Sequence, residues 1–181
     1  GGPLGVAALI LKRGLDIEPI LHGGGQERDI RSGTFNAPSI VAFAAAAKES
    51  VAAANDRSVT VRKLKQELIQ TIKKNVPEIW VNGDQEKSLP GIVSTTFPKT
   101  DSEGLLLLLD GEGIACSTGS ACSAGVQRPS HVLLAMGLSE DETTSTLRFS
   151  LSHSNTITEI AKLGAVIASV VARSKAASGK K

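Results

Sequence analysis

The chain has 181 residues, a net charge of +2, a hydrophobic share of 41% and a charged share of 21%, which is ordinary for a globular protein with a buried core. Its length allows one domain or a domain with an appended piece. Aromatic residues make up 3%, tyrosine is absent and the basic residues are scattered, so we expect no nucleic-acid-binding surface.

The first 40 residues predict two strands, a glycine-rich loop and the start of a helix. The apolar runs at residues 5–12 and 18–22 are typical of interior strands. Three consecutive glycines follow, and Asn36 then offers a helix N-cap with Pro38 in the first turn. A chain that opens on an interior strand without a partner strand indicates the end of a larger sheet, most of which we expect outside this sequence.

A long helical segment is predicted from Asn36 to about Asn75, with a break near residues 55–56. Four apolar side chains recur on one face of this segment at helical spacing: Val61, Leu64, Leu68 and Ile72. This spacing predicts that the face packs against a core. The segment therefore connects the first region to a second one.

After Pro77 short strands alternate with helices. Strands are predicted at residues 79–82, 92–97, 113–116 and 145–150, and helices from Asp101, over 129–136 and from Thr156 to about Arg173. Residues 139–142 are predicted to cap a short turn and residues 156–159 to cap the last helix, both with the capping-box pattern. This alternation indicates an α/β fold with helices on a small sheet. We therefore expect four segments: the end of a large sheet domain over 1–40, a connecting helix over 41–75, a small α/β domain over 76–173 and a disordered tail over 174–181.

The two cysteines, Cys116 and Cys122, are expected to be free thiols. They are too close in sequence for a disulfide to restrict much chain, and with His131 they lack the spacing of a zinc site. No signal peptide is recognised and the longest apolar run, residues 105–109, is too short to span a membrane, so we expect a reducing cytoplasm and no membrane partner. Glycines and small hydroxyl residues surround Cys122 over 117–125, a setting that suits a mobile thiolate nucleophile.

Four short motifs occur in order: His-Gly-Gly-Gly-Gln-Glu-Arg at residues 22–28, Arg-Ser-Gly-Thr at 31–34, Gly-Ser-Ala-Cys at 119–122 and Leu-Arg-Phe-Ser at 147–150. Their order and spacing resemble the C-terminal half of the cysteine desulfurases, pyridoxal-phosphate enzymes of fold type I in the class-V aminotransferase group. The resemblance covers nearly the whole chain, and four motifs in order are far more specific than any one of them. It implies that residues 1–40 end the large pyridoxal-phosphate-binding domain.

The resemblance also implies roles for five residues. Cys122 would be the nucleophile that takes sulfur from L-cysteine as a persulfide and leaves L-alanine, and Arg148 would bind the substrate carboxylate through its planar guanidinium. Ser32, Gly33 and Thr34 would bind the phosphate of pyridoxal 5'-phosphate in the partner subunit, which implies a homodimer with shared sites. The long form of the cysteine loop implies transfer of sulfur to an iron–sulfur scaffold or another acceptor protein, for iron–sulfur cluster or thio-cofactor assembly.

Other interpretations stay open. The family's Schiff-base lysine would fall just ahead of Gly1, so the isolated chain is expected to be inactive and could act as a non-catalytic module that binds a scaffold or acceptor. A selenocysteine lyase or an aminotransferase of the same class is a further alternative. For single residues the alternatives are an inert loop thiol at Cys122, a surface ion pair at Arg148 and a helix-entry residue at Thr34. Cys116 is interpreted as a packing residue.

Overall fold

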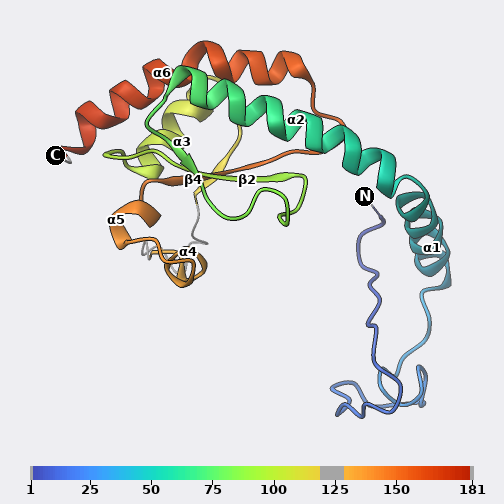
Figure 1. The fold of residues 1–181 in the computed structure, drawn as a ribbon. Coiled ribbons are helices and arrows are strands. Elements are labelled where there is room, and N and C mark those ends of the chain that lie inside the picture. The colour runs from blue at the N-terminus through green and yellow to red at the C-terminus, as the bar shows by residue number, and fades with distance from the viewer. Residues whose placement is uncertain (1, 119–128, 180–181) are drawn as a thin grey trace. The chain divides into compact units, whose positions relative to one another are not determined.

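The computed structural model describes residues 2–118 and 129–179. Contacts divide the chain into two compact units, Gly1–Ala54 and Asn55–Lys181, and each is described by itself. The first unit consists of extended chain and a helix, and the second contains a small sheet covered by helices (Figure 1). The mixed α/β class expected from the sequence is confirmed.

The helical stretch consists of two helices, α1 (Ala37–Ala52) and α2 (Ala54–Asn75), which meet at Ala53. The Asn36 side chain caps α1 by accepting a hydrogen bond from the Ser39 N–H at 3.3 Å, as expected for this position. The predicted break is present, and it lies slightly earlier in the chain than expected.

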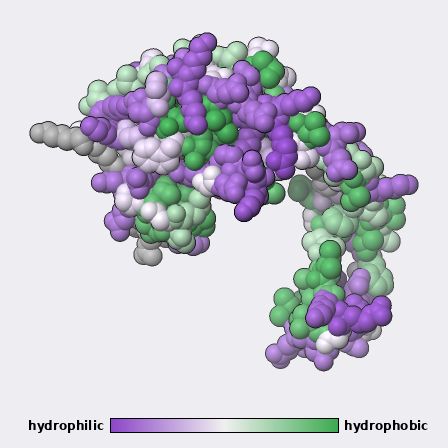
Figure 2. Space-filling view, in the orientation of Figure 1, coloured by the Kyte–Doolittle hydropathy of each residue, from purple (hydrophilic) through white to green (hydrophobic). Residues whose placement is uncertain are grey.

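The strands predicted in the first unit, at residues 5–12 and 18–22, are not formed. A strand is stable only when a neighbouring strand satisfies its backbone hydrogen bonds, and no described segment pairs with either run. Their apolar side chains stay at the surface, with Ile10 93% exposed and Ile20 91% exposed. Figure 2 shows apolar residues at the surface of this unit. The prediction of strands at these two runs is therefore wrong for the described chain.

The second unit is built around a four-stranded antiparallel sheet in the order β1-β2-β4-β3. Its strands are β1 (Trp80–Val81), β2 (Ile92–Thr96), β3 (Ser117–Thr118) and β4 (Thr146–Ser150). Along the β2–β4 pair, Val93 lies opposite Phe149 and Thr95 lies opposite Leu147. These four residues are buried, so they form the inner face of the sheet.

The strand predicted at residues 113–116 is misplaced, since β3 pairs only at Ser117–Thr118. The N–H groups of Gly113 and Ile114 donate to carbonyls at the end of α3 (Ser102–Gly111), at 2.8 and 2.9 Å, so they are not available to the sheet. Gly113 has a φ of +70°, the left-handed conformation with which helices commonly end. The pattern of small and apolar residues did not distinguish this helix exit from a strand.

One face of the sheet is covered by α2, α3 and α6 (Ile157–Ser178) (Figure 1). The face of α2 that was predicted to pack inward is buried, from Val61 at 6% to Ile72 at 1% exposed. The core also contains apolar residues of the sheet, its flanks and the other two helices: Val93, Phe97, Leu105, Leu109, Leu147, Phe149, Ile160, Leu163, Ile167 and Val170. This core fixes the sheet and leaves its other face to polar side chains.

Two short helices, α4 (His131–Ala135) and α5 (Glu140–Thr143), lie on the other side of the sheet (Figure 1). Ser130 and Ser139 cap them, and Ser139 forms the predicted capping box. The Thr146 hydroxyl at the start of β4 donates to the last turn of α5, at the Glu142 carbonyl, over 2.7 Å. This bond ties α5 to the sheet.

α6 begins at the predicted capping box over residues 156–159. It continues through Ser178, so the expectation of a disordered tail is wrong for residues 174–178. The end of the helix is held because Ser178 Oγ donates to the Lys99 carbonyl at 2.8 Å. No helix in the described part of the chain is both long enough and apolar enough to cross a membrane.

Candidate functional site

Arg148 lies in the middle of β4, between the buried Leu147 and Phe149, and its side chain is exposed on the outer face of the sheet. Its cross-strand neighbours are Ser94 on β2 and Ser117 on β3. One guanidinium N–H donates to Ser117 Oγ at 3.4 Å. Within the described residues no carboxylate forms an ion pair with Arg148, so most of its five N–H donors remain for a ligand.

A chain of hydrogen bonds runs along the same outer face of the sheet. Asn82 Nδ2 donates to Ser94 Oγ at 3.2 Å and to Thr96 Oγ1 at 2.9 Å. The hydroxyls of Thr96 and Thr146 are 2.7 Å apart, and Thr146 donates to the Glu142 carbonyl. Because Thr146 gives its proton to Glu142, Thr96 is the donor to Thr146, and Asn82 Oδ1 at 3.3 Å is a second, more distant acceptor for the Thr96 proton. No sequence signal singles out these residues, since only strand pairing brings them together.

Of the two cysteines, Cys116 lies within the described residues. Cys122, the predicted nucleophile, lies outside the described residues. Cys116 is half-buried and packs against the core, as predicted. Burial raises the pKa of the Cys116 thiol to about 11, and the negative charge of Asp110 adds to this effect. Cys116 therefore stays protonated at neutral pH and is a poor nucleophile.

In the first unit the glycine-rich loop packs directly against Ser32, which is 8% exposed. Ser32 Oγ accepts a hydrogen bond from the Gly25 N–H at 3.3 Å, and the Ser32 N–H donates to the Leu21 carbonyl at 3.4 Å. A Cβ at Gly23 would lie 3.3 Å from the Ser32 Cβ, so the close approach favours glycine there. The two sequence motifs of this unit are thus brought together.

Gly33 and Thr34 follow Ser32 directly, so the three predicted cofactor-binding residues form one short loop. The Gly33 N–H donates to Gln26 Oε1 at 2.9 Å. Gly33 has a φ of +124°, and a Cβ there would lie 3.0 Å from Arg31 Nη1, so glycine is required. Thr34 is exposed. The sequence analysis missed the contact of Gln26, because an amide beside a glycine run carries no signal of its own.

Between these two motifs the chain makes a strained turn. Glu27, Arg28 and Asp29 have φ values of 51°, 58° and 63°, a left-handed conformation that costs non-glycine residues about 1–3 kcal/mol each. Two backbone hydrogen bonds hold the turn, from the Asp29 N–H to the Gly25 carbonyl at 3.3 Å and from the Ile30 N–H to the Glu27 carbonyl at 3.1 Å. The turn returns the chain so that Gln26 reaches Gly33.

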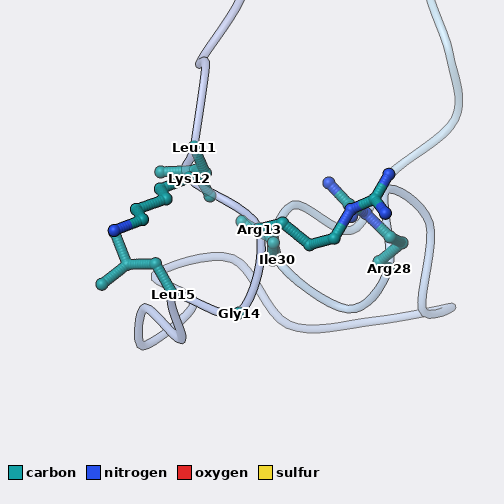
Figure 3. A pocket seen from close by; sticks show the side chains of 7 residues that line it. All are labelled: Leu11, Lys12, Arg13, Gly14, Leu15, Arg28 and Ile30. Atoms are coloured by element: carbon teal, nitrogen blue, oxygen red, sulfur yellow. The ribbon is translucent and has the colours of Figure 1, made fainter.

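A cavity of about 170 Å³ lies in the same unit and is lined by Leu11, Lys12, Arg13, Gly14, Leu15, Arg28 and Ile30. In Figure 3 Lys12 and Arg13 extend in opposite directions, and Arg28 lies on the side to which Arg13 extends. None of the three predicted cofactor-binding residues lines it, so the cavity is a separate feature. Over the described ranges, no three metal-ligating side chains come together.

The model of the class-V aminotransferase family matches residues 1–163 of the chain. The chain is 42% identical over 178 residues to an IscS-like cysteine desulfurase of Mycobacterium tuberculosis, with 98% of this chain and 45% of that protein covered. It is 40% identical over 172 residues to cysteine desulfurase IscS 1 of Archaeoglobus fulgidus, with 95% and 45% covered. A solved structure of a NifS-like protein from Rickettsia africae matches with a TM-score of 0.74 at 31% identity, over 86% of this chain and 40% of that one. The chain thus spans about 45% of the length of these curated relatives.

Proposed function

This chain belongs to the class-V aminotransferase family, which uses pyridoxal 5'-phosphate, and from this premise we propose that it supplies the substrate-binding and sulfur-accepting parts of a cysteine desulfurase. The proposed reaction converts L-cysteine to L-alanine and passes the sulfur atom to an acceptor. The observation that carries the proposal is the placement of Arg148, which has no carboxylate partner among the described residues and lies beside the strand that leads to Cys122. The names of the relatives, which are cysteine desulfurases, support the same reaction.

Arg148 is proposed to bind the carboxylate of L-cysteine. A planar guanidinium can bind a carboxylate through two parallel N–H···O hydrogen bonds, which fixes the orientation of the substrate as well as its position. β4 is a paired strand with a buried inner face, so the arginine stands on a rigid element. The alternative of a surface ion pair lacks an acidic partner within the described ranges.

Cys122 is proposed to be the nucleophile. The chain reaches Cys122 four residues after Thr118 on β3, and four extended residues span about 14 Å at most. The Cys122 thiolate attacks the sulfur of L-cysteine: an S–S bond forms, the Cβ–S bond breaks, and the carbon keeps the electron pair and takes a proton. The products are L-alanine and a persulfide on Cys122. Cys116 does not compete, because its raised pKa of about 11 keeps it protonated.

Ser32, Gly33 and Thr34 are proposed to hold the phosphate of the cofactor. The donor set fits a phosphate, because two hydroxyls and the Arg31 guanidinium lie along one short loop. The Gly33 N–H is already bonded to Gln26, so we assign the contacts to the hydroxyls of Ser32 and Thr34, with Gly33 allowing the loop conformation. When bound, the cofactor supplies the electron-accepting ring that weakens bonds at the substrate.

A second subunit and a sulfur acceptor complete the proposal. We expect a homodimer in which the loop over residues 32–34 serves the cofactor of the partner subunit. The persulfide would then pass to an iron–sulfur scaffold protein or to another acceptor in thio-cofactor assembly. Because a free thiol stays reduced in reducing surroundings, the cytoplasm is the proposed compartment.

The test uses protein in which this chain is joined to the part of the relatives that it does not match, either as the natural protein or as a fusion with that part of the Mycobacterium tuberculosis relative. Sulfide and L-alanine are measured after pyridoxal 5'-phosphate, L-cysteine and a thiol reductant are added. We expect both products in equal amounts, loss of both in Cys122→Ser, and retention of both in the matched control Cys116→Ser. Sulfide release by Cys122→Ser at the parent rate would exclude the nucleophile role.

A non-catalytic module that binds a scaffold or acceptor is the second candidate function. The observation that favours it for the isolated chain is its coverage of only about 45% of the relatives' length. Titration of the isolated chain with pyridoxal 5'-phosphate separates the two functions. A new visible absorption band of the bound cofactor would support catalysis by this chain alone, and its absence would support the module.

A further inference from the structure

Ser94 on β2 lies directly opposite Arg148 on β4, on the same outer face of the sheet. In an antiparallel pair the Cβ atoms of opposite residues are about 4.5–5.5 Å apart. Ser94 is half-buried and Arg148 is exposed, so the hydroxyl lies at the base of the arginine rather than in open solvent. A carboxylate that Arg148 binds on the β2 side of its guanidinium would therefore approach the Ser94 hydroxyl.

The directions of its hydrogen bonds show that the Ser94 hydroxyl still has a proton to donate. Ser94 Oγ accepts a hydrogen bond from Asn82 Nδ2, and the second proton of this amide goes to Thr96. Asn82 is 9% exposed, and its backbone N–H also donates to the Ser94 carbonyl at 2.8 Å, so the amide is held in place. Within the described part of the chain no group accepts the proton of Ser94. Its hydroxyl is therefore an oriented donor without an acceptor.

Ser117, on the other side of Arg148, has the opposite role. Its Oγ accepts the hydrogen bond from Arg148 Nη2 at 3.4 Å and donates its own proton to the Thr118 carbonyl at 3.0 Å. Since both directions are used, Ser117 can hold the guanidinium but cannot donate to a ligand. The two serines beside Arg148 thus differ: Ser117 orients the arginine, and Ser94 offers a free O–H.

We propose that Ser94 donates a second hydrogen bond to the carboxylate that Arg148 binds, and that Ser117 is a positioning residue for Arg148. A carboxylate has about four acceptor positions, so it can take two N–H bonds from the guanidinium and one O–H bond from Ser94. The proposal rests on the proposed function of Arg148 and deepens it. It selects amino acids over the corresponding amines, because an amine without the carboxyl group has no oxygen to accept the bond.

The test measures binding of L-alanine and of ethylamine, which is L-alanine without its carboxyl group, to the cofactor-loaded protein, from the change in cofactor absorption. Ser94→Thr and Ser94→Val are compared because they have nearly the same shape and differ in the hydroxyl. We expect Ser94→Thr to keep the parent affinity for L-alanine and Ser94→Val to lose about threefold to tenfold, the value of one hydrogen bond. Affinity for ethylamine should be equal in the two variants. Ser150→Ala, on the same face of β4, is the matched control and should bind both ligands like the parent.

Equal affinity of Ser94→Thr and Ser94→Val for L-alanine overturns the proposal. An equal loss for L-alanine and ethylamine in Ser94→Val also overturns it, because it shows a structural effect without carboxylate recognition. Failure of the proposed function gives a different result: the parent protein then releases no sulfide from L-cysteine and binds neither ligand. For Ser117→Ala we expect weaker L-alanine binding in the parent background and no further loss in an Arg148→Ala background, since a positioning residue acts only through its partner.

Discussion

The two units of this chain differ in whether their apolar residues are buried. In Asn55–Lys181 the apolar faces of three helices and of the sheet meet in one core, where Ile167 and Leu147 are fully buried. In Gly1–Ala54 the apolar runs stay at the surface, and Ser32 is the one buried residue among those described (Figure 2). An apolar pattern therefore indicates which residues favour burial, whereas burial itself needs a second surface to pack against.

The largest effect is expected from the same substitution made in both units. Ile167→Ala should lower the free energy of unfolding by about 2–5 kcal/mol, because it leaves a cavity in the core. Ile10→Ala should change it by no more than about 0.5 kcal/mol, because the side chain is 93% exposed. Chemical denaturation of the isolated chain measures both. Equal losses at the two positions would contradict the comparison.

Burial in the second unit also controls the reactivity of the Cys116 thiol. With a pKa of about 11, its thiolate fraction at pH 7.5 is about 300-fold lower than that of a thiol with an ordinary pKa near 8.5. In Cys122→Ser, which leaves Cys116 as the remaining cysteine, alkylation should be slower than that of free cysteine by about this factor and should rise with pH toward 11. Alkylation of this variant as fast as free cysteine would show that the thiol is not protected.

Arg148 is exposed, but we expect its substitution to impair the binding of L-cysteine. It is exposed like the residues of the first unit, yet Arg148→Lys should raise KM for L-cysteine by about tenfold to a hundredfold, because lysine cannot form two parallel bonds to a carboxylate. The free energy of unfolding should change by no more than about 0.5 kcal/mol. Steady-state kinetics and denaturation of the cofactor-loaded protein measure the two values. Unchanged kinetics would remove the assignment.

Lys65 is a charged residue inside the second unit. It is 4% exposed on α2, and its Nζ donates to Ser88 Oγ at 2.6 Å and to the Leu89 carbonyl at 3.3 Å. Burial lowers the pKa of this amine, and the positive charge of Arg62 lowers it further. The unfolded chain then binds the proton more tightly, so stability should rise with pH between the lowered pKa and the ordinary value near 10.4.

Lys65→Met should remove this contribution to the pH dependence. At pH 7 we expect a change of only about 1 kcal/mol, since the loss of two hydrogen bonds and the relief of a buried charge oppose each other. The matched control is Lys63→Met, on the exposed side of the same helix, which should keep the parent pH dependence. Denaturation curves from pH 7 to 10 compare the three proteins. An identical pH dependence in Lys65→Met and the parent would contradict the lowered pKa.

The features predicted correctly from the sequence are those that depend on residues close together in the chain. The capping boxes at Ser139 and Thr156 and the buried face of α2 depend on residues within a few positions of one another, and all are present. The strands predicted before residue 23 failed, because a strand needs a partner strand and no described segment pairs with these runs. The strand predicted at 113–116 failed because backbone bonds to α3 compete with the sheet.

The candidate site was predictable in part. Arg148 could be selected because it stands in a motif, but nothing in the sequence places Ser94 opposite it, since the β2–β4 register joins residues far apart in the chain. Gln26 was missed for a similar reason: its bond to Gly33 depends on a turn of three left-handed residues that are not glycine. Sequence motifs identified the candidate site residue Arg148, whereas only the fold identified Ser94 and Gln26 as supporting residues of the two candidate sites.

The most direct test of the account is mass spectrometry of the cofactor-loaded protein after brief exposure to L-cysteine without a reductant. We expect that the peptide containing Cys122 gains the mass of one sulfur atom, that the peptide containing Cys116 does not, and that L-alanine appears in the same amount. A gain on Cys116, or formation of L-alanine with no sulfur on Cys122, would contradict it.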